Sequence, residues 1–264
     1  MKRAEGRIIE MRSRWKKYVI LVCGIMAVLF AAAAGLVYAV YYGYYHVNGF
    51  RAAKYPVRGV DVSHYQGEID WDVLAAQDIQ FAYIKATEGS SHVDGRFDEN
   101  YREARKTQLR VGAYHFFSFD SPGTTQAENF IRTVEKFEGM LPPVVDVEFY
   151  GNKEANPPAS EEVWPQLQAY LDAVEEAYGL RPVIYATYES WELYIKGQFD
   201  DYPLWIRDIW SKPKADVPWT LWQYTNRGRL KGFSGEESYV DLNVFMGTVE
   251  EWEKSRFTKI TSIM

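Results

Sequence analysis

A long stretch without charged residues is the first feature of the chain. Residues 18–50 contain no Asp, Glu, Lys or Arg, and residues 18–40 form a nearly unbroken apolar run. As an α-helix this run spans about 34 Å, slightly more than the ~30 Å of a bilayer core. Tyrosines near both ends of the run suit the membrane–water interface. The pattern predicts a transmembrane helix over residues 18–40.

From residue 57 onwards, short β-rich runs alternate with helical patterns. Eight runs predict strands, at 57–62, 80–86, 110–117, 143–149, 182–187, 203–208, 219–224 and 239–244. Helical patterns cover 71–77, 98–107, 124–137, 161–178 and 190–196. The fourth of these helices follows Ser160, a favourable N-cap residue, and stops at Gly179.

This order of elements predicts an α/β fold. Strands that alternate with helices usually form a parallel sheet covered by those helices. Eight strands in about 200 residues suggest a (β/α)8-type barrel. The last three strands follow one another too closely for full covering helices. We therefore expect an irregular barrel with few helices on its C-terminal half, preceded by one N-terminal transmembrane helix.

Charge is distributed unevenly along the chain. The first 17 residues carry a net charge of +5 and the whole chain carries −6, so the remainder carries −11. Because basic residues mark the cytoplasmic side of a membrane span, we expect a single-pass plasma-membrane protein with residues 1–17 in the cytoplasm. The acidic body then lies outside, in an extracellular or periplasmic space. The alternative is a secreted protein released by signal cleavage, although an apolar signal region is usually about 7–15 residues long.

The residue types exclude several classes of function. The only cysteine, Cys23, lies in the apolar run, so the body has no disulfide framework and no cysteine-based zinc site or nucleophile. The chain contains no H-E-x-x-H pattern, no phosphate-binding loop and no dinucleotide-binding fingerprint. An acidic body is also unlike a general nucleic-acid binder. We therefore predict no metal, no cofactor and no nucleic-acid partner.

The fourth predicted strand contains a pair of acids, Asp146 and Glu148. Positions i and i+2 of a strand face the same way, so the two carboxyl groups share one face. Val145, Val147 and Phe149 then face the helix layer, and both acids point into the barrel mouth. Two carboxyl groups in a partly dry site cannot both ionise cheaply, so one pKa rises. A protonated carboxyl beside an ionised one can cleave a glycosidic bond. The alternative is an ordinary pair neutralised by Lys85 or Arg207.

Other acids stand at strand ends, where the reactive groups of such barrels lie. Asp61 ends the first strand, Asp208 ends the sixth, and Asp241 starts or lies within the eighth. Asp61 could instead serve a turn or a helix cap. Asp241 lies between Val240 and Leu242 and needs a hydrogen-bond partner if it is buried, so a structural role is the alternative.

Aromatic residues gather near the same rim and could stack on the apolar faces of sugar rings. They are Tyr83, Tyr114, Phe116, Tyr185, Trp205, Trp222 and Tyr224. We predict that these residues and Lys85 bind substrate. The alternative for many of them is packing within the barrel.

Seven short blocks, in this order, resemble a known enzyme family. They are Gly59-Val60-Asp61-Val62-Ser63-His64-Tyr65-Gln66-Gly67, Ile84-Lys85-Ala86-Thr87-Glu88-Gly89, Gly112-Ala113-Tyr114-His115-Phe116, Asp146-Val147-Glu148, Leu204-Trp205-Ile206, Trp222-Gln223-Tyr224 and Val240-Asp241-Leu242-Asn243-Val244-Phe245. Residues 57–252 thereby resemble the glycoside hydrolase family 25 lysozymes, the Chalaropsis-type N-acetylmuramidases. Each block is weak alone, but all seven in family order are highly specific.

The resemblance implies a flattened, irregular barrel that hydrolyses the β-1,4 bond between N-acetylmuramic acid and N-acetylglucosamine in peptidoglycan. It implies Glu148 as the general acid and Asp146 as the group that orients the 2-acetamido group of the substrate, which would act as nucleophile in a retaining reaction. Asp61 and Asp241 are the other acids of the implied site. Arg207 departs from the family pattern by adding a positive charge near the rim, and Gln108 replaces a common glycine.

The predicted organisation has five parts. They are a cytoplasmic head (1–17), a transmembrane helix (18–40), a juxtamembrane linker (41–56), a catalytic domain (57–252) and a C-terminal tail (253–264). We expect a monomer whose partners are peptidoglycan strands and, through residues 18–40, the lipid bilayer. Two other functions remain open: a non-catalytic, membrane-tethered peptidoglycan-binding scaffold and a related glycosidase that cleaves chitin.

Overall fold

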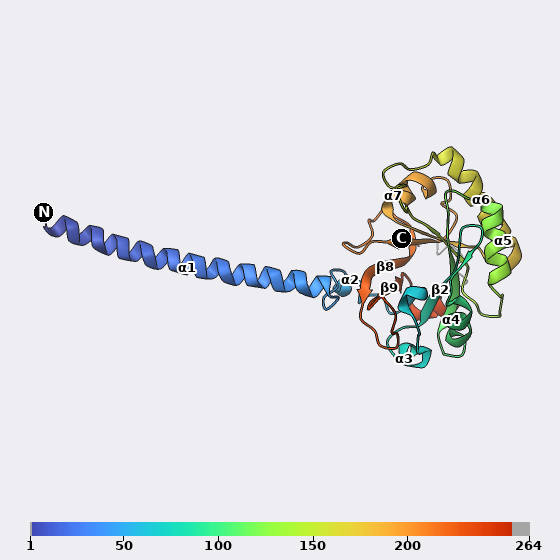
Figure 1. Cartoon of the computed structure of the whole chain (residues 1–264), viewed down its shortest axis with the longest axis horizontal. Helices are drawn as coiled ribbons and strands as arrows, with labels where there is room; N and C mark the ends of the chain where they lie inside the picture. Colours follow the sequence, from blue (N-terminus) through green and yellow to red (C-terminus); the bar gives the residue numbers. More distant parts are fainter. Residues whose placement is uncertain (1, 255–264) are drawn as a thin grey trace. The chain divides into compact units, whose positions relative to one another are not determined.

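A long N-terminal helix forms the first of two compact units (Figure 1). The structure is a computed structural model that describes residues 2–254, so most of the predicted tail at 253–264 lies outside the described residues. The units divide between Tyr45 and His46. Helix α1 (Lys2–Tyr41) includes the predicted span, and its part Arg14–Tyr41 is long and apolar enough to cross a membrane. A signal sequence near the N-terminus shares this property.

The second unit is built on a closed barrel of eight strands. Neighbouring strands follow the order β1-β9-β8-β7-β6-β5-β4-β2, and a pairing between β1 and β2 closes the circle. The eight strands are β1 (Arg58–Val62), β2 (Phe81–Glu88), β4 (Arg110–Phe116), β5 (Val144–Val147), β6 (Val183–Ala186), β7 (Leu204–Arg207), β8 (Trp219–Gly228) and β9 (Val240–Phe245). The short β3 (His92–Val93) pairs with the end of β2. All eight predicted strands are confirmed.

The direction of the last strand differs from the expectation of parallel strands. Within the barrel, the pairs from β1 and β2 round to β8 are parallel, whereas β9 is antiparallel to both of its neighbours, β8 and β1; the short β3, outside the barrel, is antiparallel to β2. A parallel return needs a crossover of a dozen or more residues, usually a helix, and the described chain between β8 and β9 has no helix. The barrel is therefore mixed, and β9 begins where the other strands end.

Helices cover one side of the barrel more than the other. The longest, α5 (Gly123–Thr133) and α6 (Ser160–Tyr178), pack side by side (Figure 1). The remaining helical segments are α2 (Gly49–Ala52), a 3-10 turn (His64–Gln66), α3 (Trp71–Ala75), α4 (Phe97–Ala104), α7 (Tyr188–Ser190), a π-helical turn (Trp191–Ile195) and α8 (Val249–Lys254). No helix separates β7, β8 and β9 within the described residues, which confirms the helix-poor C-terminal half.

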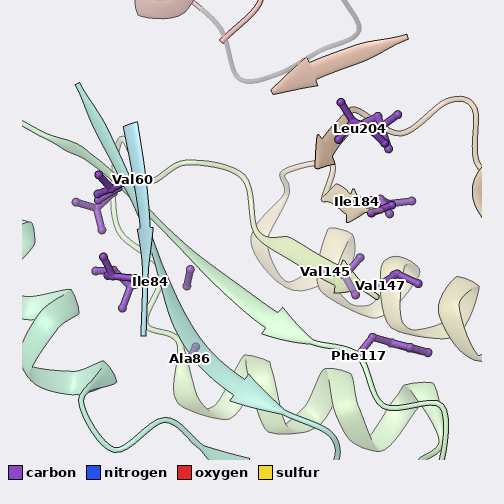
Figure 2. Packing of buried hydrophobic residues seen from close by; sticks show 14 of the residues in the cluster. Val60, Ile84, Ala86, Phe117, Val145, Val147, Ile184 and Leu204 are labelled. Carbon is purple, nitrogen blue, oxygen red and sulfur yellow. The ribbon is translucent and has the colours of Figure 1, made fainter. Parts of the chain in front are cut away.

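Alternation along the strands divides the core into two layers. Apolar residues on the outer face of the barrel pack against the helices, and Figure 2 shows several of them on neighbouring strands: Val60, Ile84, Val145, Val147, Ile184 and Leu204. A separate cluster fills the barrel interior with large rings, including Phe81, Tyr83, Trp205 and Phe245. The predicted outward direction of Val145 and Val147 is therefore confirmed, and Val144 and Asp146 point inward.

Candidate active site

Four carboxyl groups line one cleft at the mouth of the barrel. The cleft has a volume of about 390 Å³ and contains Asp61, Asp146, Glu148 and Asp241 in its wall. Asp61 and Asp146 lie near the carboxyl ends of β1 and β5. Asp241 joins them from the opposite sequence direction because β9 is antiparallel, and it pairs directly with Asp61 in the sheet register.

Asp61 is the best hydrogen-bonded acid of the cluster. Its Oδ2 accepts a bond from Nδ2 of Asn243 at 2.7 Å, and both carboxylate oxygens accept from Nε2 of Gln223 at 3.2 and 3.3 Å. A further side-chain hydrogen bond joins it to Asp241. Burial raises the pKa of Asp61, while these bonds act in the lowering direction. Asn243 and Gln223 were not predicted as site residues, although both lie inside the quoted blocks.

Asp146 and Glu148 enter the cleft from the end of β5. Asp146 is only 8% exposed, and its Oδ1 atom has no hydrogen-bond partner among the described residues. Burial, then the negative charge of Glu148, raises the pKa of Asp146 well above its ordinary value. Burial also raises the pKa of Glu148, and the positive charge of Arg207 opposes that rise. Burial in this cleft therefore favours the protonated form of both carboxyl groups more than water does.

The cations near the pair do not form an ordinary ion pair with it. Nζ of Lys85 binds Oε2 of Glu88 at 2.8 Å and lies 5.1 Å from the centre of the Phe116 ring. The half-buried Arg207 affects Asp146 and Glu148 through space, and its side chain has no ion pair within the described part of the chain. The neutralised-pair alternative therefore has little structural support.

Five of the eight predicted substrate-binding residues line the cleft: Lys85, Tyr114, Phe116, Tyr185 and Trp205. The other three do not. Tyr83 is fully buried inside the barrel, where its hydroxyl donates to the carbonyl oxygen of Pro142. Trp222 and Tyr224 face the outer layer because Leu221 and Gln223 take the inward positions of β8. These three placements near the rim were wrong because the sequence alone does not fix the depth or the facing side of each ring.

Asp208 also lies outside the cleft and instead stabilises a turn. Its Oδ1 accepts bonds from the backbone N–H groups of Trp210 and Ser211, and its Oδ2 accepts from the Ser211 hydroxyl. The cleft wall contains further residues that were not predicted as site residues. They are Val62, Ser63, Tyr65, Gln66, Glu88, Val144, Tyr150, Gln223 and Glu237.

A second hollow of about 880 Å³ adjoins the cleft and shares part of its wall. Glu148, Tyr185 and Asp241 belong to both hollows, and Arg207 and Trp210 line the second. The two together form a groove with Glu148 in the shared wall, a shape suited to a polymer that extends beyond the reacting bond. No cluster of metal-ligating side chains is found in the described part of the chain.

A mixed barrel with a carboxylate-rich cleft at its strand ends defines the class: a glycoside hydrolase. Comparison with known proteins gives the particular family. The family model "Glycosyl hydrolases family 25" matches residues 60–233, and the chain belongs to this family. This result confirms the resemblance stated from the seven blocks and the prediction of a glycosidase of the lysozyme type.

Individual relatives agree with this assignment. The structure of a family 25 glycosyl hydrolase from Bacillus anthracis is 53% identical, with a TM-score of 0.72, and the match covers 76% of this chain and 93% of that one. The uncharacterised protein YegX of Escherichia coli K12 is 37% identical, over 81% of this chain and 79% of its own. Lysozyme M1 of Streptomyces globisporus is 34% identical, over 73% of this chain and 68% of its own.

Proposed function

We propose that the protein hydrolyses the β-1,4 bond between N-acetylmuramic acid and N-acetylglucosamine in peptidoglycan. The observation that carries this proposal is the cleft in which Asp61, Asp146, Glu148 and Asp241 meet at the barrel mouth. The family supports peptidoglycan hydrolysis, and Lysozyme M1 is a relative over most of the chain. The complete acidic set argues against a scaffold that has lost its activity.

Glu148 is our candidate for the general acid. It stands in the wall that the cleft and the neighbouring hollow share, so its carboxyl group can reach a glycosidic oxygen between two sugars. Burial raises its pKa, which keeps a proton available for the leaving oxygen. In this step the C1–O bond breaks and the proton of Glu148 moves to the departing oxygen.

Asp146 is the candidate partner of the 2-acetamido group. In a substrate-assisted reaction the acetamido oxygen attacks C1 while the leaving group departs, and a water molecule later opens the resulting cyclic ion with retention. The unpartnered Oδ1 of Asp146 offers an acceptor inside the cleft that could hold the acetamido N–H. Asp61 and Asp241 would hold the pair in its charge state and bind the sugar.

The proposed location is the outer side of the plasma membrane. Helix α1 crosses the bilayer with residues 1–17 in the cytoplasm, and the barrel unit faces the cell wall. The competing arrangement is a secreted enzyme formed by signal cleavage. In either arrangement we expect a monomeric enzyme, and the predicted domain limits at 57 and 252 remain predictions.

The test is mass spectrometry of purified peptidoglycan after incubation with the protein, followed by borohydride reduction. The proposal requires new reducible muramic acid ends, and Glu148→Gln should lower their rate of formation by about 10²–10⁴-fold. The matched control is Glu162→Gln, because Glu162 is exposed on α6 and lines neither the cleft nor the neighbouring hollow. Full activity of Glu148→Gln would remove Glu148 from the mechanism.

The same experiment separates the competing functions. New reducible glucosamine ends would keep the glycosidase class but change the bond. Retained wall binding without any new ends would favour the membrane-tethered scaffold. Faster cleavage of chitooligosaccharides than of peptidoglycan would favour the chitin-cleaving alternative.

A further inference from the structure

The segment 46–56 is fastened to the barrel at the side of the groove. Asn48 is fully buried, and its Nδ2 donates to the carbonyl oxygens of Asp208 at 3.0 Å and Tyr224 at 3.4 Å. Nε2 of His46 lies 3.0 Å from the carbonyl oxygen of Arg227. Arg227 lines the second hollow, and Asp208 directly follows Arg207 in its wall. The contacts therefore tie the segment to β8 and to the residue after β7, beside the substrate groove.

Apolar packing provides a second attachment. Ala52 of α2 is buried, and the ring of Tyr55 meets Trp219 edge-on at 5.3 Å and Trp222 at 6.4 Å. Large aromatic contacts of this kind contribute substantially to packing. The segment thus belongs to the barrel unit.

The other side of the segment is exposed and carries an unusual combination of residues. Phe50 is 83% exposed, and Arg51, Ala53 and Lys54 beside it are exposed as well. Nζ of Lys54 lies 6.0 Å from the centre of the Phe50 ring. An aromatic ring accompanied by two cations is the combination that proteins present to a membrane–water interface.

Charge along the chain distinguishes this surface from the rest of the body. No Asp or Glu occurs between Glu10 and Asp61, whereas the body as a whole is strongly acidic. An anionic surface would therefore repel most of the barrel unit and attract this part of it. The chain also limits the distance between α2 and the end of α1. Gly49, the first residue of α2, follows Tyr41, the last residue of α1, by only eight residues, or about 28 Å fully extended.

We infer that Phe50, Arg51 and Lys54 form a lipid-docking surface that rests on the anionic headgroups of the membrane crossed by α1. Phe50 enters the interface, and the two cations bind lipid phosphates. Because the opposite side of the segment is bonded to β8 and to Asp208, beside the groove, docking keeps the groove close to the bilayer. If the proposed hydrolase activity holds, its substrate is then the membrane-proximal layer of glycan strands.

The test uses the full chain and its single cysteine. In a Cys23→Ser background, Phe50→Cys is labelled with a polarity-sensitive fluorophore and reconstituted in vesicles of phosphatidylcholine and phosphatidylglycerol. We expect blue-shifted emission and at least threefold stronger quenching by headgroup-level nitroxide lipids than for a label at Val73→Cys. Val73 is 40% exposed and lies on α3, away from α2 (Figure 1), so it is the matched control.

Two further measurements test the chemistry of the contact. In the variant that combines Arg51→Glu with Lys54→Glu, the emission of the label at position 50 should approach that of the label at position 73. The same change is expected in vesicles of phosphatidylcholine alone. Equal, water-like emission at both positions would overturn the inference. Quenching that is the same in charged and uncharged vesicles, and the same in the variant that combines Arg51→Glu with Lys54→Glu, would overturn the choice of anionic headgroups. The fluorescence does not depend on hydrolysis, so these outcomes are separate from a failure of the proposed activity.

Discussion

Asp61 and Asp241 face each other across the β1–β9 pair, and their surroundings favour different protonation states for the two carboxyl groups. Asp61 accepts bonds from Nδ2 of Asn243 and Nε2 of Gln223, and these bonds lower its pKa against the rise that burial causes. Burial and the neighbouring Asp61 raise the pKa of Asp241 well above its ordinary value. These effects favour the protonated form of Asp241, which can donate a hydrogen bond to Asp61, so we expect the negative charge to be concentrated on Asp61.

This division predicts unequal effects of two similar substitutions. An amide at position 241 can still donate to Asp61, whereas an amide at position 61 removes the charge that the network stabilises. We expect Asp241→Asn to keep at least tenfold more kcat/KM than Asp61→Asn, measured as the release of reducing ends. Equal losses in the two variants would contradict the assigned protonation states.

The raised pKa of Asp241 also affects the free energy of unfolding. The folded protein binds the Asp241 proton more tightly than the unfolded chain does, so stability falls as pH rises above the ordinary pKa of aspartate. Asp241→Asn removes this loss. Its melting temperature should exceed that of the unaltered protein at neutral pH, and the difference should shrink in acid.

Arg207 is expected to set the alkaline limit of activity. Its positive charge lowers the raised pKa of Glu148, so the general acid loses its proton at a lower pH than it otherwise would. Arg207→Gln should therefore move the alkaline limb of the kcat/KM profile to higher pH, and Arg207→Lys should leave it near its original place. An unmoved profile in Arg207→Gln would show that the charge is too well screened to matter.

At the level of elements, the contact between α5 and α6 depends on Gly123. A Cβ atom at this position would lie 1.8 Å from the backbone oxygen of Gln166, and backbone cannot give way as a flexible side chain does. Gly123→Ala should lower the free energy of unfolding by about 1–3 kcal/mol in denaturant titrations. Gly95→Ala is the control, because nothing lies within 4 Å of its Cβ position. Equal effects would show that α5 shifts without cost.

Local sequence predicted where helix α6 ends, but it did not predict the hydrogen bond that Ser160 makes at the start of the helix. Helix α6 stops at Gly179, as predicted, because this residue adopts φ of 63° at the C-cap. Ser160 is instead the first helical residue, and its hydroxyl donates to the carbonyl oxygen of Leu193 rather than capping the helix. Leu193 is distant in sequence, so no local pattern could have indicated that partner.

For the whole molecule, the open question with the largest consequence is whether α1 stays attached. The apolar run at residues 18–40 is longer than an ordinary signal region, so we expect retention. Fractionation followed by N-terminal peptide mapping should find the first residues intact in the membrane fraction. A mature chain that begins near Val40 would establish the secreted form. The surface formed by Phe50, Arg51 and Lys54 would then no longer be attached to a membrane.

The sequence by itself determined the strand and helix pattern, the inward direction of Asp146 and the family, because period-two alternation and ordered motif blocks are local properties. The tertiary structure decided which distant side chains meet. The antiparallel β9 brings Asp241 next to Asp61. Asn243 and Gln223 donate hydrogen bonds to Asp61. On β8, Trp222 faces the outer layer and so does not line the rim. Those outcomes depend on strand direction and barrel closure, which are set by packing across the whole unit.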